Sequence, residues 1–82
     1  MSVEYYKKQI IDLRARLARE KEAKKRDNEH YATLIKSASS SYKPSYRKSK
    51  IDRAASHDRQ IESIKRQIDS AKASLARERA RK

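Results

Sequence analysis

An apolar residue recurs along this chain at alternating steps of three and four, and one interruption divides the pattern in two. Before the interruption the pattern contains Tyr6, Ile10, Leu13, Leu17, Tyr31 and Leu34, and after it Ile51, Ile61, Ile64, Ile68 and Leu75. A mean period of about 3.5 residues is typical of helices that pack in a coiled coil. The lack of glycine and the single proline favour a chain that is almost entirely helical.

The interruption has the composition of a turn, because it is rich in serine and contains Pro44. The predicted segments are a first helix over about 2–36, a turn over 37–45 and a second helix over about 46–80, all within one domain, 1–82. Ser2 is the expected N-cap of the first helix, and Ser45 or Ser49 that of the second. Proline at position 44 disfavours a helical conformation for the residue before it.

We therefore predict an all-α fold, an antiparallel two-helix coiled-coil hairpin. If the numbers of facing residues add up to about 85, Leu17 faces Ile68 and Ile10 faces Leu75, as an apolar seam requires. Two helices bury only a narrow seam, so we expect a second copy to complete a dimeric four-helix bundle. The apolar residues of the repeating pattern, Tyr6 to Leu34 and Ile51 to Leu75, are the predicted assembly seam.

Three charged residues, Glu20, Lys24 and Asp27, occupy positions of the apolar pattern in the middle of the first helix. Such residues can fix the register of a coiled coil at a cost in stability. Long side chains can also lay their stems on the seam and keep their charges in water, which is the arrangement we expect here.

The same register brings Asp27 opposite Asp58 and His30 near His57. Two carboxylates and two imidazoles at one level of a helical bundle could hold zinc or manganese. Each carboxylate, however, has an arginine as its sequence neighbour, which favours ion pairs. We expect no metal and no cofactor, and since the sequence shows no pattern of catalytic residues, we expect no enzyme activity.

Positive charge is the one extreme of the composition, with a net charge of +12. Residues 37–50 contain four cations and no carboxylate, so a candidate anion-binding site lies at the turn. Its cations are Lys43, Arg47, Lys48 and Lys50. Tyr42 and Tyr46 alternate with these cations, a combination that single-stranded nucleic acids bind. A lipid headgroup, an acidic protein or simple solubility are alternative explanations of the charge.

The remaining features of the sequence bear on where in the cell the protein is located. There is no cysteine, and no apolar run approaches the ~20 residues of a membrane span. The first residues lack the apolar core of a signal peptide, so we expect a cytoplasmic location. The sequence favours a non-catalytic oligomerisation or protein-interaction module, with itself or other protein chains as partners; the alternative is a basic hairpin that binds nucleic acid or another anionic surface through its tip.

The segment Ile35-Lys36-Ser37-Ala38-Ser39-Ser40-Ser41, followed by Ser45 and Lys48-Ser49-Lys50-Ile51, carries a resemblance to a known family. It resembles the N-terminal helical modules of bacterial TIR-domain proteins and related immune effectors, in which a serine-rich break joins two heptad helices. The resemblance implies a bacterial self-assembly module that gathers an effector domain. The chain departs from that family because its 82 residues leave no room for a TIR domain or its NAD-cleaving glutamate.

Overall fold

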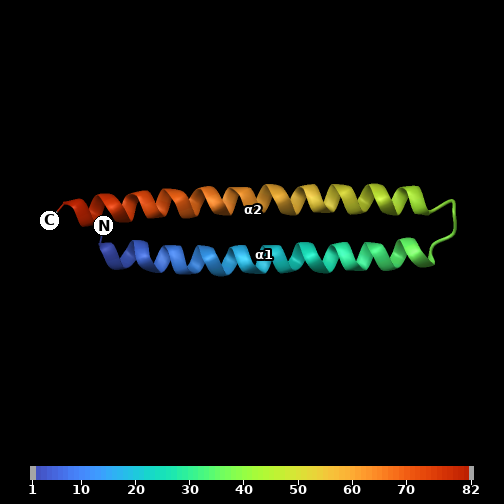
Figure 1. Cartoon of the computed structure of the whole chain (residues 1–82), viewed down its shortest axis with the longest axis horizontal. Coiled ribbons are helices and arrows are strands. Elements are labelled where there is room, and N and C mark those ends of the chain that lie inside the picture. Colours follow the sequence, from blue (N-terminus) through green and yellow to red (C-terminus); the bar gives the residue numbers. More distant parts are fainter. Residues whose placement is uncertain (1, 82) are drawn as a thin grey trace.

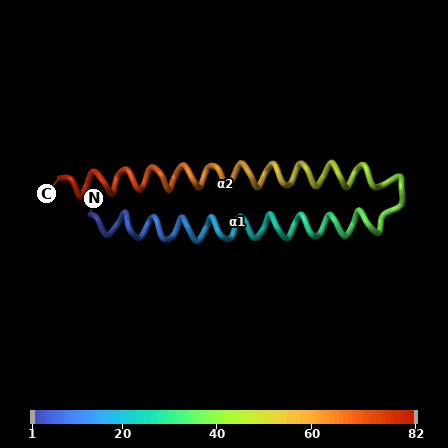
Figure 2. The backbone as a smooth tube through the Cα atoms, viewed as in Figure 1, coloured from blue at the N-terminus to red at the C-terminus, as the bar shows by residue number. Residues whose placement is uncertain are grey.

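The computed structural model describes residues 2–81, which form two helices joined by a short turn (Figure 1). Helix α1 spans Val3–Ser37 and helix α2 spans Lys43–Ala80. They run side by side in opposite directions along their whole length, so both chain ends lie at one end of the rod (Figure 2). The rod measures 65 × 14 × 12 Å. The predicted all-α hairpin is confirmed, while the dimeric bundle stays a prediction.

At both ends of helix α1, a serine hydroxyl forms a hydrogen bond with a backbone group of the helix. Ser2 Oγ accepts a hydrogen bond from the Tyr5 amide at 3.2 Å, so Ser2 is the N-cap. At the other end, the Ser37 hydroxyl donates to the Thr33 carbonyl at 3.1 Å. The next residue, Ala38, is extended with φ −77° and ψ 152°, which ends the helix.

The turn closes on one carbonyl oxygen, that of Ser39, which accepts from the amides of Tyr42 at 3.0 Å and Lys43 at 3.3 Å. No residue from 2 to 81 has a positive φ, so the turn forms without glycine. Helix α2 begins at Lys43, three residues before the expected start, because Pro44 fits the first turn, where its missing N–H costs nothing. The expected caps Ser45 and Ser49 therefore lie inside the helix.

The core is a single narrow seam. Among residues 2–81, the buried apolar side chains are Ile10, Leu13, Ile61, Ile64, Ile68 and Ala71. No side chain described is fully buried. Tyr6, Leu17, Tyr31, Leu34 and Leu75 are half-buried. Neither helix, over the part of the chain that the structure describes, has an apolar stretch long enough to cross a membrane.

Ile51 differs from its expected place in the seam, because 68% of its surface is exposed. Counting back from Ile61 by four and then three residues reaches His57 and Ala54, and four more reach Lys50. Ile51 lies one residue beyond that line and so projects from the side of the seam. The apolar pattern after the turn thus contains one isoleucine that the partner helix does not cover.

Candidate functional site

The middle of the rod is held by charged side chains, which we call the central polar layer. It consists of Glu20, Lys24 and Asp27 from α1 and of Arg53, His57 and Asp58 from α2. The layer contains three anionic carboxylates and, when the histidine is protonated, three cations. These contacts join one helix to the other, so they favour one alignment of the two helices.

His57 is at the centre of this layer, with one carboxylate at each ring nitrogen. Its Nδ1 lies 2.5 Å from Glu20 Oε1 and its Nε2 lies 2.6 Å from Asp27 Oδ2. A neutral imidazole has a single N–H and can donate only one of these bonds. The protonated ring donates both, so the geometry fits an imidazolium between two carboxylates. The side chain is 16% exposed, which keeps most water away from these contacts.

Two further ion pairs complete the layer. Asp27 Oδ2 accepts from Arg53, whose Nη2 is 3.1 Å away, so this carboxylate binds two cations. Lys24 Nζ donates to Asp58 Oδ1 at 2.6 Å, with the lysine side chain 34% exposed and the aspartate 58% exposed. The expectation that the charge of Glu20 would remain in water is wrong: the side chains of Glu20 and Asp27 are both about three-quarters buried and bind across the seam.

These contacts change two pKa values. Hydrogen bonds to Asp27 and then to Glu20 raise the pKa of His57 above its ordinary 6.5. The hydrogen bond from His57 lowers the pKa of Asp27 below its ordinary 3.8, with Arg53 acting in the same direction. Both shifts favour the charged forms of the two groups.

The four residues considered for a metal site do not come together. Asp58 binds Lys24, and His30 packs edge-on against Tyr31 with ring centroids 5.6 Å apart. Glu20 and Asp27 approach opposite ring nitrogens of His57, which point away from each other, so the three cannot share one ion. Within residues 2–81, no group of three or more acidic, histidine or cysteine side chains could hold a metal ion.

Sequence reasoning placed His57 near His30, and Asp58 opposite Asp27, and so missed the role of His57. The signal was present in the spacing, because His57 lies four residues before Ile61 and three after Ala54. Those steps continue the alternation of three and four that defines the seam. A register derived from that spacing would have put His57, rather than Asp58, between the helices.

One flank of the hairpin carries isoleucines that neither helix covers, and we call it the isoleucine flank. Ile11 is 65% exposed, Ile51 is 68% exposed and Ile35 is half-buried. They lie in two shallow grooves between the helices, one near the open end and one near the turn. The first groove is lined by Lys7, Ile10, Ile11, Arg14, Lys72 and Leu75, and the second by Asn28, Ile35, Arg47, Lys50, Ile51 and Ala54.

The two grooves open on the same side of the rod. Lys7 and Arg14 in one groove and Asn28 and Ile35 in the other are separated by whole heptads along α1. Residues a whole heptad apart share one face of a coiled-coil helix. The opposite flank is polar, with shallow grooves lined largely by Tyr5, Gln9, Arg16, Gln67, Ser70 and Ser74. The hairpin therefore has one apolar and one polar flank.

The turn and the first turns of α2, which we call the tip, carry the predicted cations. Arg47 and Lys50 line the groove with Ile51, and Lys43 is half-buried like Lys50. Lys48 is exposed outside that groove. The rings of Tyr42 and Tyr46 lie near each other, with centroids 6.4 Å apart and planes tilted by 34°. The structure thus brings two of the four cations together and adds a ring pair beside them.

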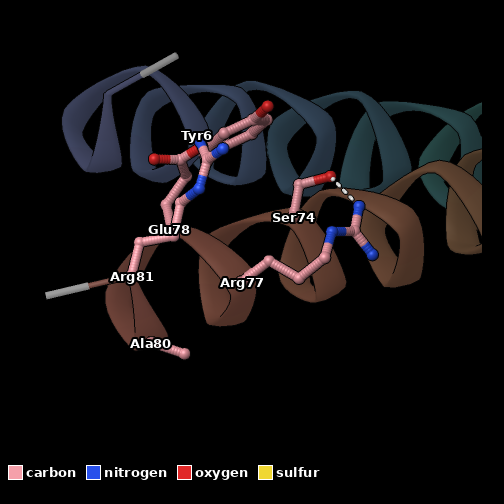
Figure 3. Close-up of a pocket in the computed structure, with 6 residues that line it drawn as sticks. All are labelled: Tyr6, Ser74, Arg77, Glu78, Ala80 and Arg81. Carbon is pink, nitrogen blue, oxygen red and sulfur yellow. Dashed lines mark hydrogen bonds and ion pairs between the residues drawn. The ribbon is translucent and has the colours of Figure 1, made fainter.

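At the open end of the rod, side chains of α2 and Tyr6 of α1 line a shallow hollow (Figure 3). Glu78 and Arg81 extend to the ring of Tyr6, which is the first aromatic residue of the seam. Arg81 donates to Glu78 at 3.2 Å, and Arg77 donates to the Ser74 hydroxyl at 3.0 Å. Both arginines thus bind acceptors on their own helix. The hollow lies where the apolar seam ends.

Comparison with family models, curated proteins and solved structures found no match.

Proposed function

We propose that this hairpin is a non-catalytic assembly module in which a second copy of the chain packs on the isoleucine flank. The observation that supports this most directly is the exposure of Ile11 and Ile51, at 65% and 68%, on one side of the rod. Each exposed isoleucine contributes about 1.5–3 kcal/mol when it is transferred from water to an apolar contact. A matching apolar flank on a second hairpin supplies that contact.

The positions of the two grooves suit a pair related by a two-fold axis. One groove lies near the open end and the other near the tip. When two rods pack antiparallel, the Ile11 groove of each copy meets the Ile51 groove of the other. A two-fold interface uses the same surface on both copies, so one pair of grooves is sufficient. The product is the four-helix bundle expected from the sequence.

The thin core gives a second reason for an assembly. A small domain buries a low fraction of its surface, and no described side chain of this hairpin is fully buried. Packing a second hairpin on the isoleucine flank turns one seam into a bundle core. The resemblance to TIR-associated modules suggests the use: an assembly that holds effector domains together and so raises their effective concentration.

Light scattering tests the proposal through the mass in solution. We expect a particle of twice the chain mass of 9.6 kDa. Substituting Ile11→Asp and Ile51→Asp should return it to one chain mass, because each copy loses both apolar contacts. The matched control is Gln60→Asp with Gln67→Asp, which changes the charge equally at exposed positions and should leave the mass unchanged. A wild-type chain of single mass at all concentrations overturns the proposal.

Salt gives an independent readout. Cations line both grooves, among them Lys7, Arg14 and Arg47, so like charges oppose the pairing of two copies. Added salt screens that repulsion, with a Debye length of about 10 Å at 0.1 M and about 3 Å at 1 M. The dimer should therefore become tighter as salt rises.

A second candidate function is binding of an anionic polymer or surface by the tip. Between Glu29 and Asp52 the chain has five cations and no carboxylate. Such a cluster of positive charge attracts anions, and this attraction weakens as salt screens it. Heparin, a polyanion without bases, is the direct probe. Binding that falls with salt and is lost when Lys43, Arg47, Lys48 and Lys50 become alanine supports this function, and retention by that variant overturns it.

A further inference from the structure

We infer that the tip binds single-stranded nucleic acid by stacking a base on Tyr42 and holding the adjoining phosphates with the surrounding cations. This inference rests on the second candidate function and names its ligand. Charge alone suits any polyanion, so the choice of ligand depends on the aromatic pair. The rest of the molecule offers no comparable combination among residues 2–81, because the Tyr5–Tyr6 pair lies next to Glu4.

The two tyrosines offer ring surface on which a base could stack. Tyr42 and Tyr46 lie one helical turn apart, and their tilted rings are 6.4 Å apart. Tyr46 is half-buried, so its ring is held in place, while Tyr42 is 62% exposed and presents its ring to solvent. Tyrosine stacks on any base, which makes this contact independent of sequence.

The cations follow the rings along the same helix. Lys43 and Arg47 each come directly after one of the tyrosines, and Lys50 lies one turn beyond Tyr46. Residues four apart on a helix are neighbours, so Lys43 and Arg47 form a column of cations beside the two rings, and Lys50 continues the column of the rings. A strand stacked on Tyr42 can run its phosphates along the cation column. Since no carboxylate lies between Glu29 and Asp52, nothing acidic in this stretch repels the backbone.

A duplex fits the tip less well than a single strand. In a duplex the bases are stacked on each other and cannot reach a tyrosine ring, so only the phosphates would be bound. Single strands expose their bases, and stacking one base contributes about a 5- to 150-fold gain in affinity. The tip should therefore prefer a single strand to a duplex of equal length.

Fluorescence anisotropy with a labelled oligothymidine of about 15 nucleotides tests the inference. Replacing Tyr42 and Tyr46 by alanine should weaken binding about tenfold or more, and Tyr42→Ala alone should reproduce part of that loss without touching a buried ring. Phenylalanine at both positions keeps the stacking faces and should bind within about threefold of wild type. The matched control, Tyr5→Ala, removes another exposed ring, at the open end, and should change nothing.

The cations have a different signature. About four phosphate contacts predict that the affinity for a single strand falls with a log–log salt slope of about −3. Alanine at Lys43, Arg47, Lys48 and Lys50 should flatten that slope. Alanine at Lys8, Arg16, Arg19 and Lys25, four exposed cations of α1, should leave most of it.

Three outcomes overturn the inference: the alanine variants of the tyrosines bind oligothymidine as tightly as wild type, a duplex binds as tightly as the single strand, or no oligonucleotide binds. Heparin separates this result from a failure of the second candidate function. If heparin binding still requires the tip cations while the tyrosines have no effect, the tip binds anions by charge alone. Light scattering on the same variants keeps the assembly proposal separate, because the tyrosine changes lie outside the residues proposed to pair the copies.

Discussion

The seam holds its two helices together differently in its two main regions. Near the open end, Ile10, Leu13, Ile64 and Ile68 pack with Ala71, and each is at most 7% exposed. In the central polar layer the helices are joined by hydrogen-bonded charges. Apolar contacts are non-directional, so they stabilise the hairpin in more than one alignment. Charged contacts are directional, and a slip of one helix along the other would break them.

The two regions therefore contribute differently to the stability of the hairpin and to its register. The apolar region removes hydrocarbon from water, which is the main stabilising term in folding. The polar layer gains less, because its ions lose hydration when they are brought between the helices. Polar residues at seam positions are known devices for fixing register. We therefore expect changes in the apolar region to affect stability most, and changes in the polar layer to affect alignment and pH dependence.

The largest expected effect comes from the apolar region. Ile64 is 4% exposed, and Ile64→Ala should lower the free energy of unfolding by about 2–4 kcal/mol, through lost burial and the cavity left behind. Urea denaturation followed by circular dichroism, at one fixed protein concentration, measures the change. The control Ile64→Val removes one methylene and should cost about 0.5–1.5 kcal/mol. Equal losses for the two variants would show that this region is not packed as a core.

Removing the centre of the polar layer should have a smaller effect. His57→Leu leaves Glu20 and Asp27 on the seam without their shared cation, and we expect a loss of about 1–2 kcal/mol in the free energy of unfolding. Replacing all three by leucine should instead give a hairpin at least as stable as wild type, since no buried charge is left. Thermal denaturation compares the two variants.

The triple variant also tests the role of the layer in register. A cysteine pair placed across the wild-type seam near Ala54 should cross-link fully in the wild-type background, because one alignment dominates. In the leucine variant it should cross-link only in part, as other alignments become populated. Full cross-linking in both backgrounds would assign the register to the apolar residues alone.

The polar layer should also make stability depend on pH. The pKa of His57 is raised in the folded state, so its contribution is complete below about 6.5 and is lost as pH rises through the raised value. The pKa of Asp27 is lowered, so its contribution is present above 3.8 and is lost as pH falls through the lowered value. The hairpin should be most stable between these two limits. Glu20, Arg53, Lys24 and Asp58 are the other charged groups of the layer.

Urea denaturation across this pH range measures the effect. Wild-type stability should fall above pH 6.5, whereas His57→Gln, which cannot gain a proton, should lose that fall. The variant His30→Gln keeps the layer intact and should retain it. A His57→Gln profile identical to wild type between pH 6 and pH 9 would mean that the imidazole is not charged in the folded protein.

The fold could be predicted from sequence because periodicity and turn composition act locally. Steps of three and four specify a helical face, and the serine-rich segment with Pro44 marks where the chain reverses. The helix start at Lys43 could not be predicted so well, since Pro44 is compatible with either side of a helix boundary. That shift matters for the tip, because it puts Tyr42 and Tyr46 one helical turn apart, with their ring centroids 6.4 Å from each other.

The central polar layer depends on register, which the sequence specified only approximately. An offset of a few residues paired Asp27 with Asp58 instead of His57 and Arg53. Apolar side chains tolerate such an offset, since any isoleucine can pack on any leucine. Ion pairs do not, because a carboxylate reaches only the cation opposite it. The apolar seam was therefore accessible to sequence reasoning and the contacts of the polar layer were not.

The smallest expected effect distinguishes two kinds of contact within the polar layer. The Lys24 and Asp58 side chains are only 2.6 Å apart, yet they are 34% and 58% exposed. Water screens such a pair, and ordering two side chains costs entropy, so Lys24→Met should change the free energy of unfolding by no more than about 0.5 kcal/mol. The methionine keeps the apolar stem of the lysine on the seam and removes only the charge. If the loss were comparable to that of His57→Leu, the polar layer would act as one network, and the short distance of the pair would matter more than its exposure to water. A negligible loss would mean that only His57 and the two carboxylates that bind it contribute to stability.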